Sequence, residues 1–261
     1  MSDIRGRFMW YELMTSDPAA ATDFYRDVVG WGTREWEGGE NPYTMWTAGD
    51  APVGGVMELP PEAVAGGAPP HWIAYIGTPD LDATLERAKE LGASVLWGPL
   101  EVPEVGRMAG IMDPQGAVFA AYTPAVEPPE GSDAPPAPGR FSWHELATSD
   151  WEAAWTFYSE LFGWRKTDAM DMGEGNMYQM YGRGGPPLGG MFNRPPEMPV
   201  SAWMLYAMVP SVEAAIEAAK ARGGQVLNGP MEVPGGDLIA QCVDPQGAAF
   251  AVHATAGSNG G

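Results

Sequence analysis

The stretch Trp10–Trp31 reads WYELMTSDPAAATDFYRDVVGW, and the chain repeats it at Trp143–Trp164 as WHELATSDWEAAWTFYSELFGW. Its first residues alternate in the period-two pattern of a strand with two distinct faces. Asp17 then predicts a helix N-cap and Pro18 the first helical residue, while Gly30 predicts the end of that helix. Each copy therefore predicts a strand followed by a helix, and a repeat of this length predicts two similar domains.

The remaining sequence predicts three short strands after each such unit, followed by a second unit of the same kind. In the first half the expected strands are Thr33–Glu37, Tyr43–Ala48, Val53–Glu58, His71–Gly77, Ser94–Trp97, Arg107–Asp113 and Ala117–Tyr122. The Pro- and Gly-rich segment Pro60–Pro70 predicts a loop. The second half repeats these features, including the turn D-P-Q-G at Asp113 and Asp244. The sequence thus predicts an α+β fold of four βαβββ modules.

The pattern places a domain boundary near the middle of the chain. Segment 127–139, EPPEGSDAPPAPG, is too rich in Pro, Gly and acidic residues to form a packed element. We therefore expect a first domain at residues 1–125, a linker at 126–139, a second domain at 140–256 and a flexible tail at 257–261. Each domain would have a common domain size.

The composition excludes several classes of partner. The 261 residues contain 34 Asp and Glu but only 14 Lys and Arg, a formal net charge of −20. A field of this sign repels nucleic acid and anionic membrane surfaces. The single cysteine forms no internal disulfide and fits a reducing compartment, and neither a signal core nor a membrane-spanning run is apparent. We expect a cytoplasmic protein, monomeric or homodimeric, whose partner is a small molecule.

The repeated T-S-D…FY…GW segment and the two D-P-Q-G turns resemble the vicinal oxygen chelate superfamily, which includes glyoxalase I, extradiol dioxygenases and bleomycin-resistance proteins. The similarity covers both halves and is greatest to tandem glyoxalase-like proteins of actinobacteria, some of them described as hydroxylases or antigens. The resemblance implies two tandem glyoxalase-like domains whose paired modules curl their sheets around a cleft. One fold of this kind hosts many chemistries, so the cleft residues must decide the function.

The resemblance also implies where a metal would be held, on His, Gln or Glu side chains of three strands. At those positions this sequence has Trp10, Ile73 and Ala120, and in the second half Trp143, Met204 and Ala251. None is a useful ligand for a divalent metal, which needs three or four converging N, O or S donors. We therefore expect no cofactor, although a shift by two residues along the strands would present Glu12 and His71 instead.

Other side chains on the expected cleft strands are candidates for ligand contacts. Glu12 and Glu145 are either general bases or ligand anchors, or structural carboxylates bonded to a neighbouring loop. Arg107 either binds an anionic ligand or holds the Glu101–Pro103 loop. The remaining candidates for substrate contacts are aromatic or histidine side chains on these strands: Trp10, His71, Tyr75, Tyr122, Trp143, Tyr206 and His253.

Two functions remain open from the sequence. One is a protein that binds a small, largely apolar or aromatic metabolite, such as a polyketide-like compound, in sheet-lined clefts without the usual metal. The other is an enzyme, either a glyoxalase-like lyase or isomerase or a dioxygenase or hydroxylase, that uses Glu12 or Glu145 with or without a metal.

Overall fold

A computed structural model describes residues 4–38, 43–126, 136–173 and 175–257. The first module contains β1 (Phe8–Thr15), α1 (Pro18–Val29), β2 (Gly32–Trp36), β3 (Tyr43–Ala48) and β4 (Ala51–Glu58). After the short helix α2 (Pro61–Ala65), the second module contains β5 (His71–Gly77), α3 (Leu81–Glu90), β6 (Ser94–Val102), β7 (Gly106–Met112) and β8 (Val118–Pro124). The segment Pro60–Pro70 was expected to be a loop. It is not a loop throughout, because Pro61 begins this one-turn helix.

The second half repeats this order. Its first module contains β9 (Phe141–Thr148), α4 (Trp151–Phe162), β10 (Arg165–Asp171), β11 (Met177–Gly182) and β12 (Pro187–Asn193). Its second module contains β13 (Ala202–Met208), α5 (Val212–Ala221), β14 (Gln225–Glu232), β15 (Leu238–Val243) and β16 (Ala249–Ala254). The predicted α+β fold of four βαβββ modules is confirmed.

The strands of the described residues form two eight-stranded sheets. Their orders are β2-β3-β4-β1-β5-β8-β7-β6 and β10-β11-β12-β9-β13-β16-β15-β14, so each sheet belongs to one half of the sequence. Within the described residues, no helix has the length and apolar character of a membrane-spanning segment.

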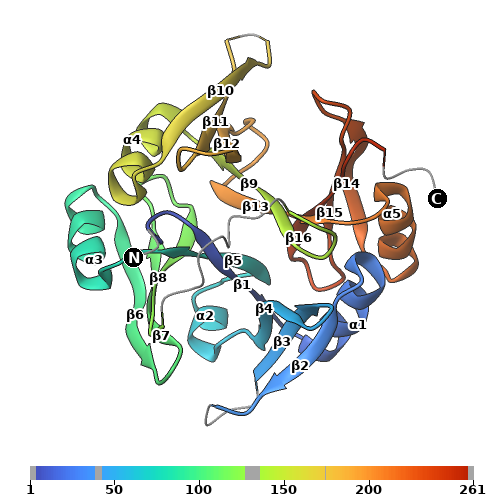
Figure 1. Ribbon diagram of the computed structural model, residues 1–261, viewed down its shortest axis with the longest axis horizontal. Coiled ribbons are helices and arrows are strands. Elements are labelled where there is room, and N and C mark those ends of the chain that lie inside the picture. Colours follow the sequence, from blue (N-terminus) through green and yellow to red (C-terminus); the bar gives the residue numbers. More distant parts are fainter. Residues whose placement is uncertain (1–3, 39–42, 127–135, 174, 258–261) are drawn as a thin grey trace. The chain divides into compact units, whose positions relative to one another are not determined.

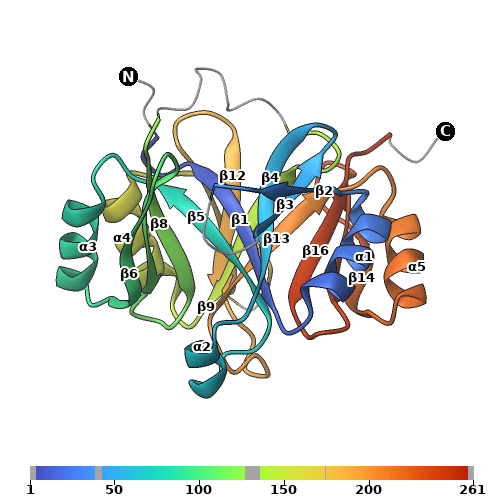
Figure 2. The same ribbon diagram turned by 90° about the horizontal axis from the view of Figure 1, so that it is seen from below.

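The chain packs as two compact units that do not follow the two halves of the sequence. Unit 1 comprises Met1–Met9, Ala74–Ala134 and Trp143–Met204, and unit 2 comprises Trp10–Ile73, Pro135–Ser142 and Leu205–Gly261. In unit 1 helix α3 lies beside α4, and in unit 2 helix α1 lies beside α5 (Figures 1 and 2). The domain limits 1–125 and 140–256 remain a prediction about the sequence repeat. Most of the expected linker and tail, at 127–135 and 258–261, lies outside the described residues.

The local signals of the repeated stretch act as expected. The Asp17 carboxylate accepts a hydrogen bond from the Ala20 backbone N–H at 3.0 Å, which caps α1. Gly30 ends the helix with a φ of 85°, a left-handed conformation that glycine adopts without strain. In the second copy Asp150 caps α4 in the same way, and Gly163 ends it.

The tyrosine of the Phe-Tyr pair in each repeated stretch bonds to the D-P-Q-G turn of the other half. In unit 2 the Tyr25 hydroxyl donates to Asp244 Oδ2 at 3.1 Å, and in unit 1 the Tyr158 hydroxyl donates to Asp113 Oδ2 at 2.9 Å. The other oxygen of each Asp accepts backbone N–H groups of its own turn. Burial raises the pKa of both Asp side chains, while these donors oppose the rise. The motifs that carry the family resemblance are therefore structural partners.

Candidate functional site

A row of three hydrogen-bonded side chains lies in unit 2. Trp10 and Glu12 come from β1 and Tyr43 from β3, and the row crosses β4 between them. Glu12 pairs with Gly55 across the β1–β4 ladder, and Gly55 pairs with Met45 on β3. Tyr43, two residues before Met45 and thus on the same face, extends back over Gly55. Its hydroxyl accepts a hydrogen bond from Trp10 Nε1 at 2.9 Å and donates one to the Glu12 carboxylate.

The same row occurs in unit 1 on β9, β12 and β11. The Tyr178 hydroxyl donates to Glu145 Oε2 at 2.9 Å and accepts from Trp143 Nε1 at 2.7 Å. We call these two groups the Trp–Tyr–Glu rows. The predicted residues Trp10, Glu12, Trp143 and Glu145 thus lie in two equivalent clusters, each of which contains a tyrosine that the sequence reasoning did not select.

The second glycine of each Gly-Gly pair makes room for the row. A Cβ atom at Gly55 would overlap the Tyr43 hydroxyl, and one at Gly190 would overlap the Tyr178 ring. The preceding Gly54 lies against the Tyr11 carbonyl oxygen, where a Cβ would also overlap. Close backbone packing, the ordinary cause of glycine within a strand, therefore explains the first glycine of the pair but not the second.

The Tyr43 phenol is a hydrogen-bond donor rather than a base. Burial and then the charge of Glu12 raise the pKa of Tyr43 far above its usual value, so that the hydroxyl keeps its proton. The phenol therefore fixes the position of the carboxylate.

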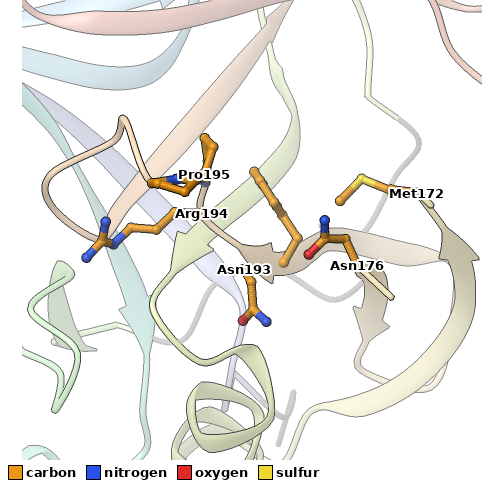
Figure 3. Close-up of a pocket in the computed structure, with 7 residues that line it drawn as sticks. Met172, Asn176, Asn193, Arg194 and Pro195 are labelled. Carbon is orange, nitrogen blue, oxygen red and sulfur yellow. The ribbon is translucent and has the colours of Figure 1, made fainter. Parts of the chain in front are cut away.

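The two rows differ in accessibility. Glu12 is 5% exposed, whereas Glu145 is partly exposed. In unit 1 the Tyr178 ring also stacks on Phe192, with 5.7 Å between ring centroids. Phe192 lines a hollow of about 300 Å³ together with Met172, Asn176 and the other residues of segment 192–196 (Figure 3). The unit 1 row therefore has a surface hollow next to it.

Three other candidates belong to unit 1. Tyr75 is buried, with its ring centroid 6.4 Å from those of both Trp97 and Tyr122. The Tyr122 hydroxyl donates to the Val105 carbonyl at 2.8 Å. These three rings form an aromatic cluster on strands β5, β6 and β8.

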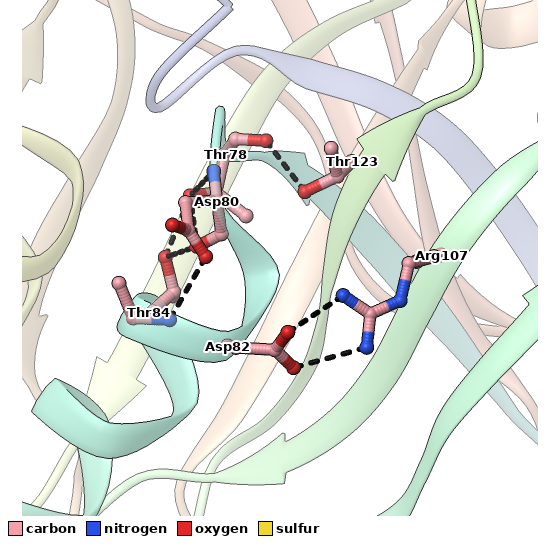
Figure 4. A network of polar contacts seen from close by, with 7 residues as sticks. Thr78, Asp80, Asp82, Thr84, Arg107 and Thr123 are labelled. Atoms are coloured by element: carbon pink, nitrogen blue, oxygen red, sulfur yellow. Dashed lines mark hydrogen bonds and ion pairs between the residues drawn. The ribbon is translucent and has the colours of Figure 1, made fainter.

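Arg107, the third of these candidates, faces helix α3. Its guanidinium donates to both carboxylate oxygens of Asp82 at 2.8 and 3.0 Å (Figure 4). This bond lowers the pKa of Asp82. The same helix begins at Asp80, which accepts the Ala83 backbone N–H at 3.0 Å. Arg107 thus ties β7 to the first turn of α3.

The last three candidates belong to unit 2. His71 Nδ1 lies 2.7 Å from the Pro69 carbonyl oxygen, a local contact. The Tyr206 hydroxyl accepts from Gln241 at 2.9 Å. His253 lies between Ser142 Oγ, 2.8 Å from its Nδ1, and Asp237 Oδ2, 2.9 Å from its Nε2. Ser142 Oγ also donates to the Tyr206 backbone carbonyl at 3.3 Å, so that His253 and Tyr206 share a partner, whereas the contact of His71 is local.

The residues at the implied metal-ligand positions do not fit a divalent metal. Indole, alkyl and methyl groups at Trp10, Ile73 and Ala120 offer no lone pair to a cation, and the second half differs only by the weak thioether of Met204. Glu12 is bonded to its row. Among residues 4–38, 43–126, 136–173 and 175–257, no three His, Cys, Asp or Glu side chains converge as a metal site requires.

Tyr43, Tyr178 and Phe192 are the site residues that sequence reasoning missed. The two tyrosines occupy matching places in the repeat, each followed eleven or twelve residues later by a Gly-Gly pair. This repeated spacing of Tyr and Gly-Gly could have been noticed in the sequence. The contact between them, however, depends on the register of β3 with β4 and of β11 with β12.

Comparison with known proteins assigns both halves to one family. The sequence profile of the Glyoxalase/Bleomycin resistance protein/Dioxygenase superfamily matches residues 7–120 and 140–252. The chain is 31% identical over 245 residues to the Mycobacterium tuberculosis protein named "Putative glyoxylase CFP32", covering 93% of this chain and 92% of the relative. It is also 31% identical over 259 residues to the anthracycline biosynthesis protein DnrV of Streptomyces peucetius, covering 93% and 91%.

Solved structures share the fold at low sequence identity. The Mn(II)-bound glyoxalase from Novosphingobium aromaticivorans aligns with a TM-score of 0.63 and 16% identity, over 96% of this chain and 82% of that one. The 2,3-dioxygenase LapB from Pseudomonas sp. KL28 aligns with a TM-score of 0.65 and 15% identity, over 96% and 93%.

Proposed function

Because the chain belongs to the Glyoxalase/Bleomycin resistance protein/Dioxygenase superfamily, we propose that it binds a small, largely apolar or aromatic metabolite beside its Trp–Tyr–Glu rows, without a divalent metal. Members of this superfamily bind small molecules. The relatives named for anthracycline biosynthesis support an aromatic ligand, since anthracyclines contain fused aromatic rings. We retain the expectation of a cytoplasmic monomer or homodimer as a prediction.

The observation that carries the proposal is the Trp143–Tyr178–Glu145 row. The family's metal position holds an indole here, and that indole donates to a phenol rather than to a ligand. The phenol in turn orients the Glu145 carboxylate. Large aromatic surfaces next to a few placed polar groups are typical of sites for small apolar ligands. The row therefore replaces metal coordination with hydrogen bonding.

The absence of a metal is tested on the purified protein. We expect elemental analysis of the as-isolated chain to find well below one equivalent of Mn, Fe, Ni or Zn. Titration with each ion should show no tight one-to-one binding by calorimetry. A stoichiometric, tightly held ion would overturn the metal-free part of the proposal and leave ligand binding to be judged separately.

Ligand binding is tested with the fluorescent anthracycline daunorubicin. We expect Glu145→Gln to weaken its binding about tenfold, equal to about 1.4 kcal/mol, because the carboxylate loses its charge and an acceptor. Glu232→Gln, an exposed change of the same charge on β14, should leave the affinity within about twofold. The acidic chain attracts this cationic probe, so the loss of one negative charge could by itself weaken binding. The Glu232→Gln control measures that general effect of charge. Unchanged affinity in both Glu12→Gln and Glu145→Gln would refute the proposal.

A second candidate function is enzymatic. The hydrogen bond from the Tyr178 hydroxyl holds the partly exposed Glu145 carboxylate in one position, and a general base must be held within reach of the proton that it takes. A lyase, isomerase, dioxygenase or hydroxylase would each use that carboxylate. Turnover of methylglyoxal–glutathione hemithioacetal or catechol, abolished by Glu145→Gln and retained in Glu232→Gln, would favour this alternative.

A further inference from the structure

The two Trp–Tyr–Glu rows are built alike but lie in different surroundings. Aligned through their Gly-Gly pairs, Phe192 and Asn193 of β12 correspond to Met57 and Glu58 of β4. Arg194 then corresponds to Leu59, which is buried. The second half therefore places a ring and an amide where the first half places a thioether and a carboxylate.

Phe192 connects the hollow in unit 1 to its row. Phe192 and Gly190 are two residues apart on β12 and so share a face, and Gly190 pairs with Glu145 on β9. The Phe192 ring lies against Tyr178 at 5.7 Å with 23° between the ring planes, which is a stacked arrangement. A molecule in the hollow would therefore lie against Phe192, next to the phenol that holds Glu145.

The hollow offers apolar surface and amides. Met172, Phe192 and two prolines supply its apolar wall, and Asn176 and Asn193 supply its polar groups. The Asn193 side chain accepts the Trp151 backbone N–H at 2.8 Å, which fixes the orientation of that amide. Figure 3 shows the Arg194 guanidinium pointing away from Met172 and Asn176, and its Nη1 donates to the Met198 carbonyl.

The charges near the hollow disfavour an anion. Among the described residues that line it, Arg194 is the one cation, and its guanidinium points away from Met172 and Asn176. Glu145 lies on the same face as Phe192, and the whole chain has a formal charge of −20. An amide hydrogen-bonds to a neutral group without a charge penalty. The hollow thus disfavours an anionic group and accepts an uncharged one. Its volume of about 300 Å³ is at the lower end of ligand pockets.

We propose that the hollow between Met172, Asn176 and Phe192 seats an uncharged aromatic group of one or two rings, so that the unit 1 row is the copy that binds the ligand. This inference rests on the proposed function and names the ligand class and the place of its ring. The ring stacks on Phe192, and its polar edge faces the amides.

Two probes of nearly equal shape test the charge and the place. N-Phenyl-1-naphthylamine is neutral, and 8-anilinonaphthalene-1-sulfonate differs from it by one sulfonate. We expect the neutral probe to bind wild-type protein at one saturable site, at least about tenfold more tightly than the sulfonate. Phe192→Ala should weaken the neutral probe about tenfold, equal to about 1.4 kcal/mol. The counterpart Met57→Ala should stay within about twofold.

Because Phe192→Ala also removes a contact with Tyr178, a second pair of variants is needed. Met172 is 43% exposed in the hollow and Leu227 is 60% exposed on β14, so alanine at either position leaves the core intact. Met172→Ala should weaken the neutral probe several-fold, and Leu227→Ala should not.

Three results would separate the inference from the function on which it rests. Wild-type binding that neither Phe192→Ala nor Met172→Ala weakens, or that Met57→Ala weakens more, overturns this inference alone. Tighter binding of the sulfonate than of the neutral probe overturns it as well. Absence of saturable binding of both probes and of daunorubicin to the wild type overturns the proposed function too.

Discussion

Replacing Tyr158 with phenylalanine removes one buried hydroxyl and keeps the ring. Tyr158 is 0% exposed; its hydroxyl donates to Asp113 Oδ2 at 2.9 Å and accepts from Trp203 Nε1 at 3.2 Å. Without the hydroxyl both groups lose a partner in a place that water does not reach. An unsatisfied buried group costs about 1–3 kcal/mol, and the longer bond to Trp203 lies at the low end. We therefore expect the free energy of unfolding to fall by about 2–4 kcal/mol.

Urea unfolding, followed by tryptophan fluorescence, measures this loss at equilibrium. The matched control is Tyr122→Phe, because that hydroxyl donates to the Val105 carbonyl in a partly exposed place where water can replace it. We expect the control to cost less than about 1 kcal/mol. In an Asp113→Asn background the effect of Tyr158→Phe should shrink, since the two changes remove one interaction. Equal, small losses in both phenylalanine variants would refute this account of the core.

Two further predictions concern the site and the response to pH. Gly190→Ala should destabilise the protein by about 1–3 kcal/mol and weaken daunorubicin binding, because its methyl group overlaps a row tyrosine; Gly185→Ala, with open space around it, should do neither. Wild-type affinity in Gly190→Ala would contradict the role of the row. Burial lowers the pKa of His144 to about 4, from 6.5, so its stabilising effect is complete above pH 6.5 and is lost as the pH falls toward 4. The stability difference between the wild type and His144→Gln should therefore change by roughly 3 kcal/mol between pH 7 and pH 4. A constant difference across that range would show that His144 is not buried as a neutral ring.

Local signals were enough to predict the elements of the fold. An Asp before an apolar helical face and a Gly after it mark both ends of α1 and α4 because they act through bonds of their own backbone. Strand lengths were less certain. A strand was predicted at Ser94–Trp97, yet β6 continues to Val102, with shifts of register on either side of Trp97.

The pairing of modules across the halves could not be predicted. Tyr25 and Tyr158 are identical in type and position within the repeat, and so are Asp113 and Asp244. A sequence with such equal copies does not state which tyrosine meets which carboxylate, because both pairings satisfy the same hydrogen bonds. Only the packing of α1 with α5 and of α3 with α4 decides between them.

The candidate site was predictable in part for a similar reason. Alternation along β1 and β9 places Trp10 with Glu12 and Trp143 with Glu145, because a strand fixes the facing of its own residues. The tyrosine between each pair comes from a strand that is not adjacent to theirs. The contact of Tyr43 with Glu12 depends on the register of β3 with β4, on the register of β4 with β1, and on the space that Gly55 leaves. Alternation within one strand specifies none of these.

The exchange of tyrosine and carboxylate between the halves also bears on how such a chain arose. Tyr25 and Asp113 lie in one half, and each finds its partner in the other. A half-length polypeptide that keeps this exchanged pairing would form the same bonds by associating with a second copy of itself. The present chain therefore has the internal contacts of a symmetric dimer whose two subunits were joined end to end. In a joined chain the two copies need not be identical, and here one half has a buried carboxylate at Glu12 while the other has a hollow beside its row.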